Sequence, residues 1–385
     1  MKEREVVIVD GCRTAFGKRG GALKTFAASE LGGICVKALL ERTQLYARGG
    51  KVDSLLAGMA NIDSKATGAA RYISQLAGLP FEVSATFVEM QDGSAITCLN
   101  HAAWKIKMGA SDIAIVGGVE SCSNNPVAFA TDNEPYQGIV PAPLPFYLTP
   151  NLDLNTSMLQ ASDNMATKWE ISREACDEFS IRSQQRLQAA YANGLIGSEI
   201  IPVTIPATRK TPEENITKDE CPRSDGTSAI IPHLGDGAAF LLIMTAEKAA
   251  ELGYTPYAKW IGCAQAGCQE DYMGVAASYS HLKAAKHLGL KLRDFDVFEC
   301  NEASAAQNLA VIKDMQDSTG ELINQAKWNP NGGAIAIGHP SGASGARISL
   351  FAMKHLEKTG GRYGSISSCC GGGLGTTAII ENLRR

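Results

Sequence analysis

Two glycine-rich segments near the carboxyl end of the chain each contain a side chain that can move a proton. His339 lies in the segment from Asn331 to Arg347, and Cys369 begins the run CCGGGLG. Dense glycine allows a backbone to approach a ligand closely, imidazole changes charge near neutral pH, and a thiol acts as an acid or base when its pKa suits. A lone histidine or cysteine is more often structural, so residue type alone leaves both interpretations open.

Metal binding is not favoured by the cysteine spacing. Cys369 and Cys370 are adjacent, and no second pair has the spacing of metal ligands. Two other segments contribute polar groups. Asn301 and Glu302 follow an expected strand, where a helix cap is the simplest interpretation, and Asp92 stands just before an expected helix over 94–108.

The composition excludes several classes of function. The 385 residues carry a formal charge of −4 with 45% hydrophobic and 20% charged residues, which is ordinary for a globular chain and offers no basic surface for nucleic acid or an anionic membrane. No apolar run approaches the roughly 20 residues needed to span a bilayer. Eleven scattered cysteines and a polar amino-terminal start favour a reducing compartment, so we expect a cytoplasmic location.

Short β-branched runs alternate with helix-period segments, a pattern that predicts an α/β fold with a mostly parallel sheet covered by helices. Strands are expected at 6–10, 52–59, 85–90, 113–118, 258–264, 296–299, 333–337, 363–368 and 376–382, and helices at 28–43, 68–78, 94–108 and 172–193. The segments 88–118 and 334–368 share one layout of strand, small-residue helix start, long helix and strand ending near glycines. This indicates an internal duplication with one active site between the halves.

The motifs together resemble the thiolase family over almost the whole chain. The segment ending at Arg347 is similar to the family motif GGAIALGHPxGASGAR. The run that begins at Cys369 is similar to the motif CxGGG, and the run that begins at Asn301 is similar to NEAF. Further similarities are residues 13–18 to RTPFGK, 171–186 to the ISRE…SQQR helix, and 235–239 to NDGAA. The resemblance implies a layered αβαβα core of two duplicated βαβ-type halves, with a loop domain inserted in the first half.

Domain boundaries follow from this resemblance and from a proline- and asparagine-rich excursion in the chain. We expect an amino-terminal half at 1–119 and 236–256, an inserted loop domain at 120–235 that covers the substrate site, and a carboxy-terminal half at 257–385.

The resemblance also implies roles for individual residues. Cys369 is the expected acid/base, and Gly371 places backbone beside the substrate. Asn301, through a water molecule, and His339 are expected to form the oxyanion site for the thioester carbonyl. Coenzyme A and acyl-CoA are then substrates, with no metal or bound cofactor implied.

Asp92 stands where the family has its nucleophilic cysteine, in a segment similar to NxxCGSG. A carboxylate at a helix N-terminus is stabilised as an anion, but it attacks a thioester poorly and would have to form a mixed anhydride, so ordinary thiolysis should be impaired. Cys98 lies six residues further, on another side of the expected helix, and should not substitute. Asp92 is open to three interpretations: an introduced substitution, a natural variant with different chemistry, or a relic without catalysis.

Other departures from the family lie around the expected acyl and CoA contacts. Ser304 replaces the phenylalanine of NEAF, which should widen the pocket or make it more polar, and Ser157 replaces a histidine before the retained Met158. The loop after Arg223 is shortened, so His233 or Pro232 stands near the place of a pantetheine-contacting serine. Arg223 can contact CoA phosphates or be a solvated loop residue. These changes predict a branched, aromatic or carboxylated acyl group.

The expected activity is therefore an acyl-CoA acyltransferase that cleaves or forms a 3-oxoacyl-CoA, impaired at position 92. One rival is an enzyme that keeps only enolate and oxyanion chemistry, such as decarboxylation, hydrolytic cleavage or C-acyl transfer. Another is a silent acyl-CoA-binding subunit that needs a catalytic partner. The resemblance implies a homodimer or homotetramer, and an accessory protein subunit is a further expected partner.

Overall fold

The computed structural model describes residues 4–130, 142–209, 211–223, 225, 227 and 229–385. Its strands are β1 (Val6–Thr14), β2 (Gly17–Lys18), β3 (Ser54–Gly58), β4 (Ser84–Val88), β5 (Ile113–Ser121), β6 (Ile200–Ile201), β7 (Val203–Ile205), β8 (Glu214–Ile216), β9 (Gly235–Thr245), β10 (Ala258–Gly267), β11 (Phe295–Cys300), β12 (Tyr363–Cys370) and β13 (Leu374–Asn382). Its α-helices are α1 (Ala28–Thr43), α2 (Ala69–Leu76), α3 (Ser94–Lys107), α4 (Met158–Lys168), α5 (Arg173–Ala192), α6 (Ala246–Glu251), α7 (Ala276–Leu288), α8 (Ala305–Thr319), α9 (Ala334–Ile337) and α10 (Ser341–Thr359).

The main sheet is symmetrical about its centre. Its strand order is β11-β12-β13-β10-β1-β9-β5-β3-β4, and β1 pairs with β10 where the two halves meet. On one side β3, β5, β9 and β1 take the places that β11, β12, β13 and β10 take on the other. The expected duplication into two halves is confirmed.

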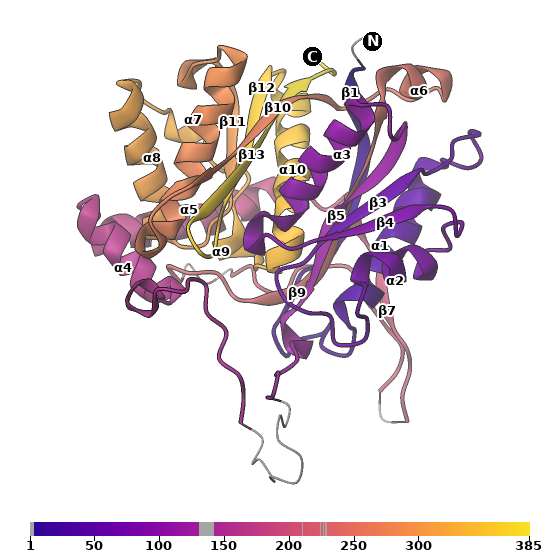
Figure 1. Cartoon of the computed structure of the whole chain (residues 1–385), viewed down its shortest axis with the longest axis horizontal. Coiled ribbons are helices and arrows are strands. Elements are labelled where there is room, and N and C mark those ends of the chain that lie inside the picture. The colour runs from indigo at the N-terminus through magenta and orange to yellow at the C-terminus, as the bar shows by residue number, and fades with distance from the viewer. Residues whose placement is uncertain (1–3, 131–141, 210, 224, 226, 228) are drawn as a thin grey trace.

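The helices complete a layered arrangement (Figure 1). The helices α1 and α2 pack on strands of the first half, and α7 packs on β10, β12 and β13 of the second half with α8 beside it. Between the halves lie α3 and α10, which contact each other and strands of both halves. This is the expected αβαβα core.

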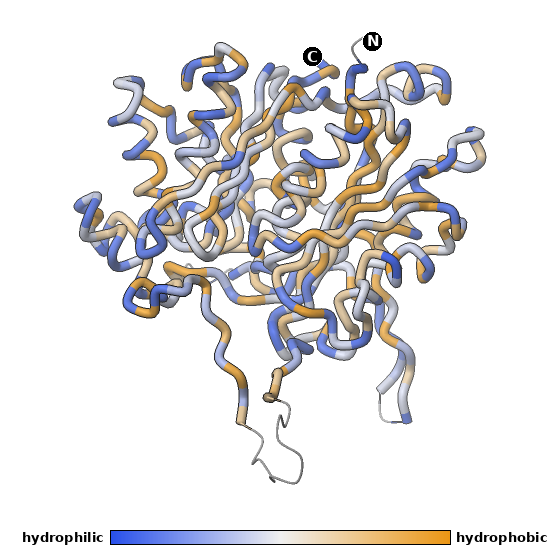
Figure 2. The backbone as a smooth tube through the Cα atoms, in the orientation of Figure 1, coloured by the Kyte–Doolittle hydropathy of each residue, from blue (hydrophilic) through white to orange (hydrophobic). Residues whose placement is uncertain are grey.

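Hydrophobic residues are concentrated along the strands of the main sheet (Figure 2). Every residue of β5 and of β9 is buried, because helices cover both faces of these strands. The two central helices approach closely at their N-termini, where a Cβ on Gly345 would lie 2.8 Å from the backbone nitrogen of Ile96. Within the described residues, no helix is long and apolar enough to cross a membrane.

The expectation of a mostly parallel sheet is wrong. Among the described strands, parallel pairing joins β3 to β4 and β5, β11 to β12, and β1 to β6, whereas the remaining pairs are antiparallel. A tight glycine turn joins β12 directly to β13, and a connection this short can only give an antiparallel pair.

The strand expected at 333–337 is also wrong, because this segment forms the single turn α9. Its bounding glycines have left-handed φ, +78° at Gly332 and +101° at Gly338, which turn the chain out of an extended path. Its backbone donors bind side chains instead of a strand: Gly333 N–H donates to Ser183 Oγ and Ile335 N–H to Glu302.

Between β5 and β9 the chain leaves the sheet, as the long excursion predicts. The described part of residues 120–235 contains α4, α5, the β7–β8 hairpin and β6, which pairs with β1. Residues 131–141 of the expected loop domain lie outside the described residues.

Candidate active site

The N-termini of α3 and α10 meet at one point between the two halves of the molecule. Asp92 precedes α3 in the 3-10 turn η1 (Gln91–Gly93), and His339 precedes α10. Their side chains touch, with His339 Nε2 3.2 Å from Asp92 Oδ1. Because both helices direct the positive ends of their dipoles toward this point, the site favours negative charge.

The backbone around Asp92 is held in a tight, strained turn. Gln91 has a φ of +46°, a left-handed conformation that side chains other than glycine seldom adopt. A Cβ on Gly93 would lie 2.5 Å from Cys370 Sγ, so only glycine fits between η1 and β12. The Ser94 hydroxyl closes the turn by donating to Gln91 O and accepting from Met90 N–H. These contacts fix the direction of the Asp92 side chain.

His339 is oriented by a serine that the sequence did not single out. Its Nδ1 lies 2.7 Å from Ser344 Oγ, and Ser344 Oγ lies 3.1 Å from Pro340 O. With Nδ1 engaged, Nε2 faces Asp92, and an ionised Asp92 is matched by a hydrogen on Nε2. The sequence feature that could have identified Ser344 is its position in the first turn of the helix that follows His339.

Cys369 lies near the end of β12, buried beside the same point. Burial, and next the charge of Asp92, raise the pKa of the Cys369 thiol well above its ordinary value, so the thiol holds its proton. The following turn needs glycine, since Gly372 and Gly373 have φ of +80° and +83°. A Cβ on Gly371 would lie 2.9 Å from Leu148 Cδ2, which places a residue of the loop excursion against this turn.

Asn301 reaches the same edge from the neighbouring strand. It follows β11, which runs parallel to β12, and its N–H donates to Ser367 O over 2.9 Å. Asn301 is fully buried, yet neither its amide oxygen nor its amide nitrogen has a hydrogen-bond partner among the described residues. A buried amide in this state is suited to hold a ligand or a water molecule.

Glu120 is a second carboxyl group that the sequence did not indicate. It lies near the end of β5 and accepts from Gly342 N–H at the start of α10, from Ala60 N–H, and from Asn61. Burial is the main cause that raises the pKa of Glu120 to about 7, and the charge of Asp92 adds to it. The sequence feature that could have identified Glu120 is its position as an acidic residue near the end of a buried strand.

Ser304 and Ser157 serve as helix caps. Ser304 is fully buried, caps α8 by accepting from Gln307 N–H, and accepts from the Ser162 hydroxyl over 2.9 Å. The structure therefore places Ser304 in a packed cap and not on an open pocket wall. Ser157 caps α4 in the same way through Gln160 N–H and is exposed. Next to it, Met158 packs against the apolar cluster that contains Cys369.

Arg223 and His233 form a pair away from Asp92. Arg223 Nη2 lies 3.0 Å from His233 Nε2, and burial followed by the charges of Arg223 and Lys18 lowers the pKa of His233. The His233 carbonyl accepts from His339 N–H over 2.8 Å, so this loop is tied to the site by its backbone. The Arg223–His233 pair is thus linked to His339 through the backbone.

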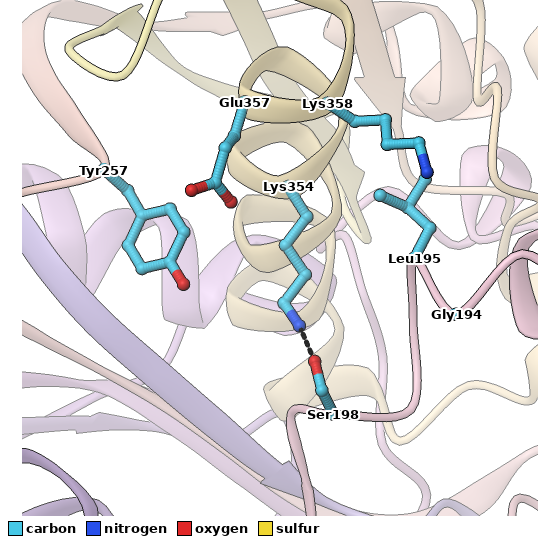
Figure 3. A pocket seen from close by; sticks show the side chains of 7 residues that line it. All are labelled: Gly194, Leu195, Ser198, Tyr257, Lys354, Glu357 and Lys358. Carbon is cyan, nitrogen blue, oxygen red and sulfur yellow. Dashed lines mark hydrogen bonds between the residues drawn. The ribbon is translucent and has the colours of Figure 1, made fainter.

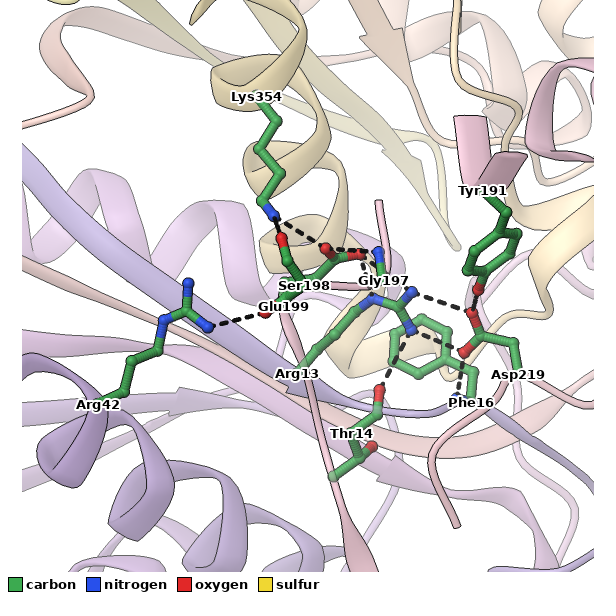
Figure 4. Close-up of polar contacts among 10 residues, drawn as sticks. All are labelled: Arg13, Thr14, Phe16, Arg42, Tyr191, Gly197, Ser198, Glu199, Asp219 and Lys354. Atoms are coloured by element: carbon green, nitrogen blue, oxygen red, sulfur yellow. Dashed lines mark hydrogen bonds and ion pairs between the residues drawn. The ribbon is translucent and has the colours of Figure 1, made fainter. Parts of the chain in front are cut away.

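A buried ionic network fastens the loop excursion to the core (Figure 4). Arg13 of β1 binds Asp219, with Nη1 2.7 Å from Oδ1, and Glu199, which also accepts from Lys354 of α10. Burial lowers the pKa of Arg13, but the charges of Asp219 and Glu199 more than offset this and raise it. Arg13 belonged to a recognised motif, but its ionic role was not visible in the sequence.

A hollow of about 290 Å³ opens beside this network, between Lys354 and Tyr257 (Figure 3). Lys354 Nζ is committed to Ser198 Oγ and Glu199. None of the residues that line this hollow belongs to the candidate site, so we interpret the hollow as part of the contact between the loop excursion and the core.

A larger cavity of about 550 Å³ lies next to the η1 turn. Gln91 and Glu89 line one side, and Phe87, Phe146, Tyr147 and Leu148 add apolar surface, with Asn61 as a polar group. Leu148 also touches the turn after Cys369, which connects this cavity to the candidate site.

The fold and the site define an enzyme whose two duplicated halves bring a helix-terminal anion, an imidazole, a thiol and an amide together. Models of the thiolase N-terminal domain and the thiolase C-terminal domain match residues 6–247 and 254–382. The chain therefore belongs to the thiolase family, whose members are acyltransferases that use CoA thioesters as substrates.

Individual relatives agree over nearly full length. The chain is 37% identical to a beta-ketoadipyl-CoA thiolase of Acinetobacter baylyi, covering 99% of this chain and 100% of the relative. It resembles the structure of an acetyl-CoA acetyltransferase from Syntrophomonas wolfei with a TM-score of 0.91, 29% identity, and coverage of 99% and 100%. It also resembles human mitochondrial 3-ketoacyl-CoA thiolase in complex with CoA, with a TM-score of 0.87, 30% identity and 98% coverage of each chain.

Proposed function

We propose that this chain acts on the carbon-carbon bond of a 3-oxoacyl-CoA, with acyl transfer through position 92 impaired. The observation that carries the proposal is the contact between Asp92 and His339 at the meeting helix N-termini. A carboxylate there accepts the N–H that an oxyanion would need, and it is a poor nucleophile toward a thioester. The proton-transfer half of the site, Cys369 with Asn301, is the part that we expect to work.

We propose a carboxylated acyl group as the substrate class. The relative from Acinetobacter baylyi is named for beta-ketoadipyl-CoA, which supports this choice. The cavity beside η1 is large enough for a medium acyl chain and offers Asn61 as a hydrogen-bond donor. On the CoA side, we propose that Arg223 and His233 contact phosphate or pantetheine groups.

Deuterium exchange tests the proton-transfer half without any acyl transfer. Incubation of acetyl-CoA with the chain in D₂O should exchange its methyl protons, because the Cys369 thiolate that forms when the thiol passes its proton to Asp92 can remove a proton from the α-carbon without any acyl transfer. Cys369→Ala should abolish this exchange. If the parent chain bound acetyl-CoA but exchanged no deuterium, the proposal would be rejected in favour of a binding subunit.

Intact-mass analysis tests the impaired half. After incubation with beta-ketoadipyl-CoA, the parent chain should carry no acyl adduct, whereas Asp92→Cys should carry one of the mass of a succinyl group. A stable adduct on the parent would show that Asp92 is acylated after all.

We also propose a homodimer formed at the edge strand β4. This strand pairs with β3 on one side, and the path of the main sheet ends there. Phe87 on β4 and Phe81 just before it are exposed, at 41% and 80%. An open edge with apolar side chains favours pairing with a second copy.

A further inference from the structure

We propose that this site cleaves the C2–C3 bond of a 3-oxoacyl-CoA by hydrolysis, with Asp92 as the general base that activates water and Cys369 as the general acid. The inference rests on the proposed function of the site and adds to it the identity of the acyl acceptor, which is water instead of CoA.

Asp92 is placed and exposed as a general base should be. Its side chain is 18% exposed, whereas that of His339 is 6% exposed, so the carboxylate can meet a water molecule, and the preceding residue Gln91 lines the adjacent cavity. His339 Nε2 engages Oδ1, which leaves Oδ2 available to accept from water. A carboxylate that attacks a carbonyl poorly can still remove a proton from water that attacks it.

Cys369 is held in the state that a general acid needs. Cys369 is 2% exposed at the end of β12, and both burial and the charge of Asp92 oppose loss of the thiol proton. It therefore starts the reaction as a thiol beside a carboxylate. That pairing supplies one base and one acid at the same point.

The reaction balances with water as the only added reactant. Asp92 takes a proton from water, the oxygen bonds to C3, and the C2–C3 bond breaks with its electron pair moving to C2. Cys369 donates its proton to C2, giving acetyl-CoA, and C3 becomes the carboxyl group of a free acid. The proton held by Asp92 then returns to the Cys369 thiolate, which restores both groups.

The buried Asn301 amide supports this route as it would support thiolysis. The enolate that forms when C2–C3 breaks carries its charge on the thioester oxygen, where the unpartnered amide of the buried Asn301 is available to a bridging group. No acyl-enzyme is formed, so the poor nucleophilicity of Asp92 does not slow the step.

Hydrolysis in labelled water tests the inference. The chain is incubated with beta-ketoadipyl-CoA or acetoacetyl-CoA in H₂¹⁸O without free CoA, and the products are analysed by mass spectrometry. We expect acetyl-CoA and a free acid that carries ¹⁸O in its new carboxyl group. Asp92→Asn should slow this cleavage by about 10²- to 10⁴-fold, whereas Asp92→Glu, which keeps the carboxylate, should retain more of it.

Two variants sharpen the result. Asp92→Cys should cleave the same substrates only when CoA is added, with no ¹⁸O in the acyl product. Asp317→Asn, the same change at an exposed position of α8, should match the parent.

Three outcomes would overturn the inference: cleavage by the parent that requires CoA, a free acid without ¹⁸O, or no cleavage at all. The deuterium exchange of acetyl-CoA separates failure of this inference from failure of the proposed function. Exchange without hydrolysis would overturn only the hydrolysis, whereas absence of both reactions would overturn both proposals.

Discussion

The two ring nitrogens of His339 make different contacts. Nε2 faces Asp92, while Nδ1 lies against the Ser344 hydroxyl, which is itself near Pro340 O. The imidazole therefore cannot present the wrong nitrogen without breaking two contacts. Because the ring orientation is fixed, the partner of Nε2–H is Asp92 in the free protein, and a bound thioester oxygen would have to compete with Asp92 for it.

We predict that Ser344→Ala lowers the rate of deuterium exchange into acetyl-CoA by about 10- to 100-fold, because His339 loses its orienting contact. Binding of acetyl-CoA should change little. Ser349→Ala is the matched control, since Ser349 is also buried on α10 and donates to Gly345 O, one turn further from the site. Equal losses in both variants would indicate a general effect on α10 and contradict the orienting role.

Motifs reveal candidate site residues better than the residues that hold them in place. His339, Cys369, Asn301 and the unusual Asp92 were all predicted, and the structure brings Asp92, His339 and Cys369 to one point. Ser344 stood inside a recognised motif, but only coordinates show that its hydroxyl meets Nδ1. Ser304 shows the converse, because a changed motif residue predicted an altered pocket whereas its hydroxyl is used in a helix cap.

Among the elements, the η1 turn places Asp92 at the start of α3. We predict that Gly93→Ala destabilises the protein by roughly 1 to 3 kcal/mol and lowers activity, because its Cβ would lie 2.5 Å from Cys370 Sγ. Thermal unfolding and the deuterium exchange assay check this. Gly68→Ala is the control, since a Cβ there would meet nothing within 4 Å. A Gly93→Ala protein as stable and active as the control would show that the turn adjusts freely.

A buried acid between β11 and α10 should make stability depend on pH. Glu299 is fully buried 3.8 Å from Arg347, and burial, opposed by Arg347, raises the pKa of Glu299 from 4.5 to about 8. The folded state thus holds a proton that the unfolded state releases above pH 4.5. This contribution to stability is complete below pH 4.5 and is lost as pH rises toward 8.

We predict that Glu299→Gln reduces the decline of unfolding free energy between pH 5 and pH 8, by up to about 1.4 kcal/mol per pH unit in that window. Urea unfolding at several pH values measures the slope. Glu321→Gln, a change at a partly buried acid on the surface, should leave the slope nearly as in the parent. An unchanged slope in Glu299→Gln would mean that Glu299 is ionised in the folded protein across the range.

Element types were predictable from periodicity where the surroundings agreed with local preference. The central helix α3 and most of the expected strands lie within a few residues of their expected places, whereas strand β9 was not predicted. The prediction of a strand at 333–337 was wrong because the apolar residues of this segment suit a buried strand, whereas its surroundings impose a helical turn. The flanking glycines turn the chain, and the backbone N–H groups of the segment bind the side chains of Ser183 and Glu302. Those partners lie far away in sequence, so no local pattern contains them.

At the scale of the whole molecule, duplication explains why one site exists. Each half supplies one central helix, and the two-fold arrangement brings both helix N-termini together. The first half contributes the anion at Asp92, and the second half contributes His339, Cys369 and Asn301. The network of Arg13, Asp219 and Glu199 then fastens the long excursion to β1.

The edge strand β4 leads to the last prediction, which concerns assembly. The chain should be a dimer in solution at micromolar concentration, and Phe87→Asp should raise its dissociation constant at least about 10-fold, because it puts an unpaired charge at an apolar contact. Sedimentation velocity over a dilution series measures both. Leu322→Asp is the control, since Leu322 is 84% exposed in the second half of the chain, away from β4. A monomeric parent, or a Phe87→Asp protein that associates as tightly as the Leu322→Asp control, would place any subunit contact elsewhere on the molecule.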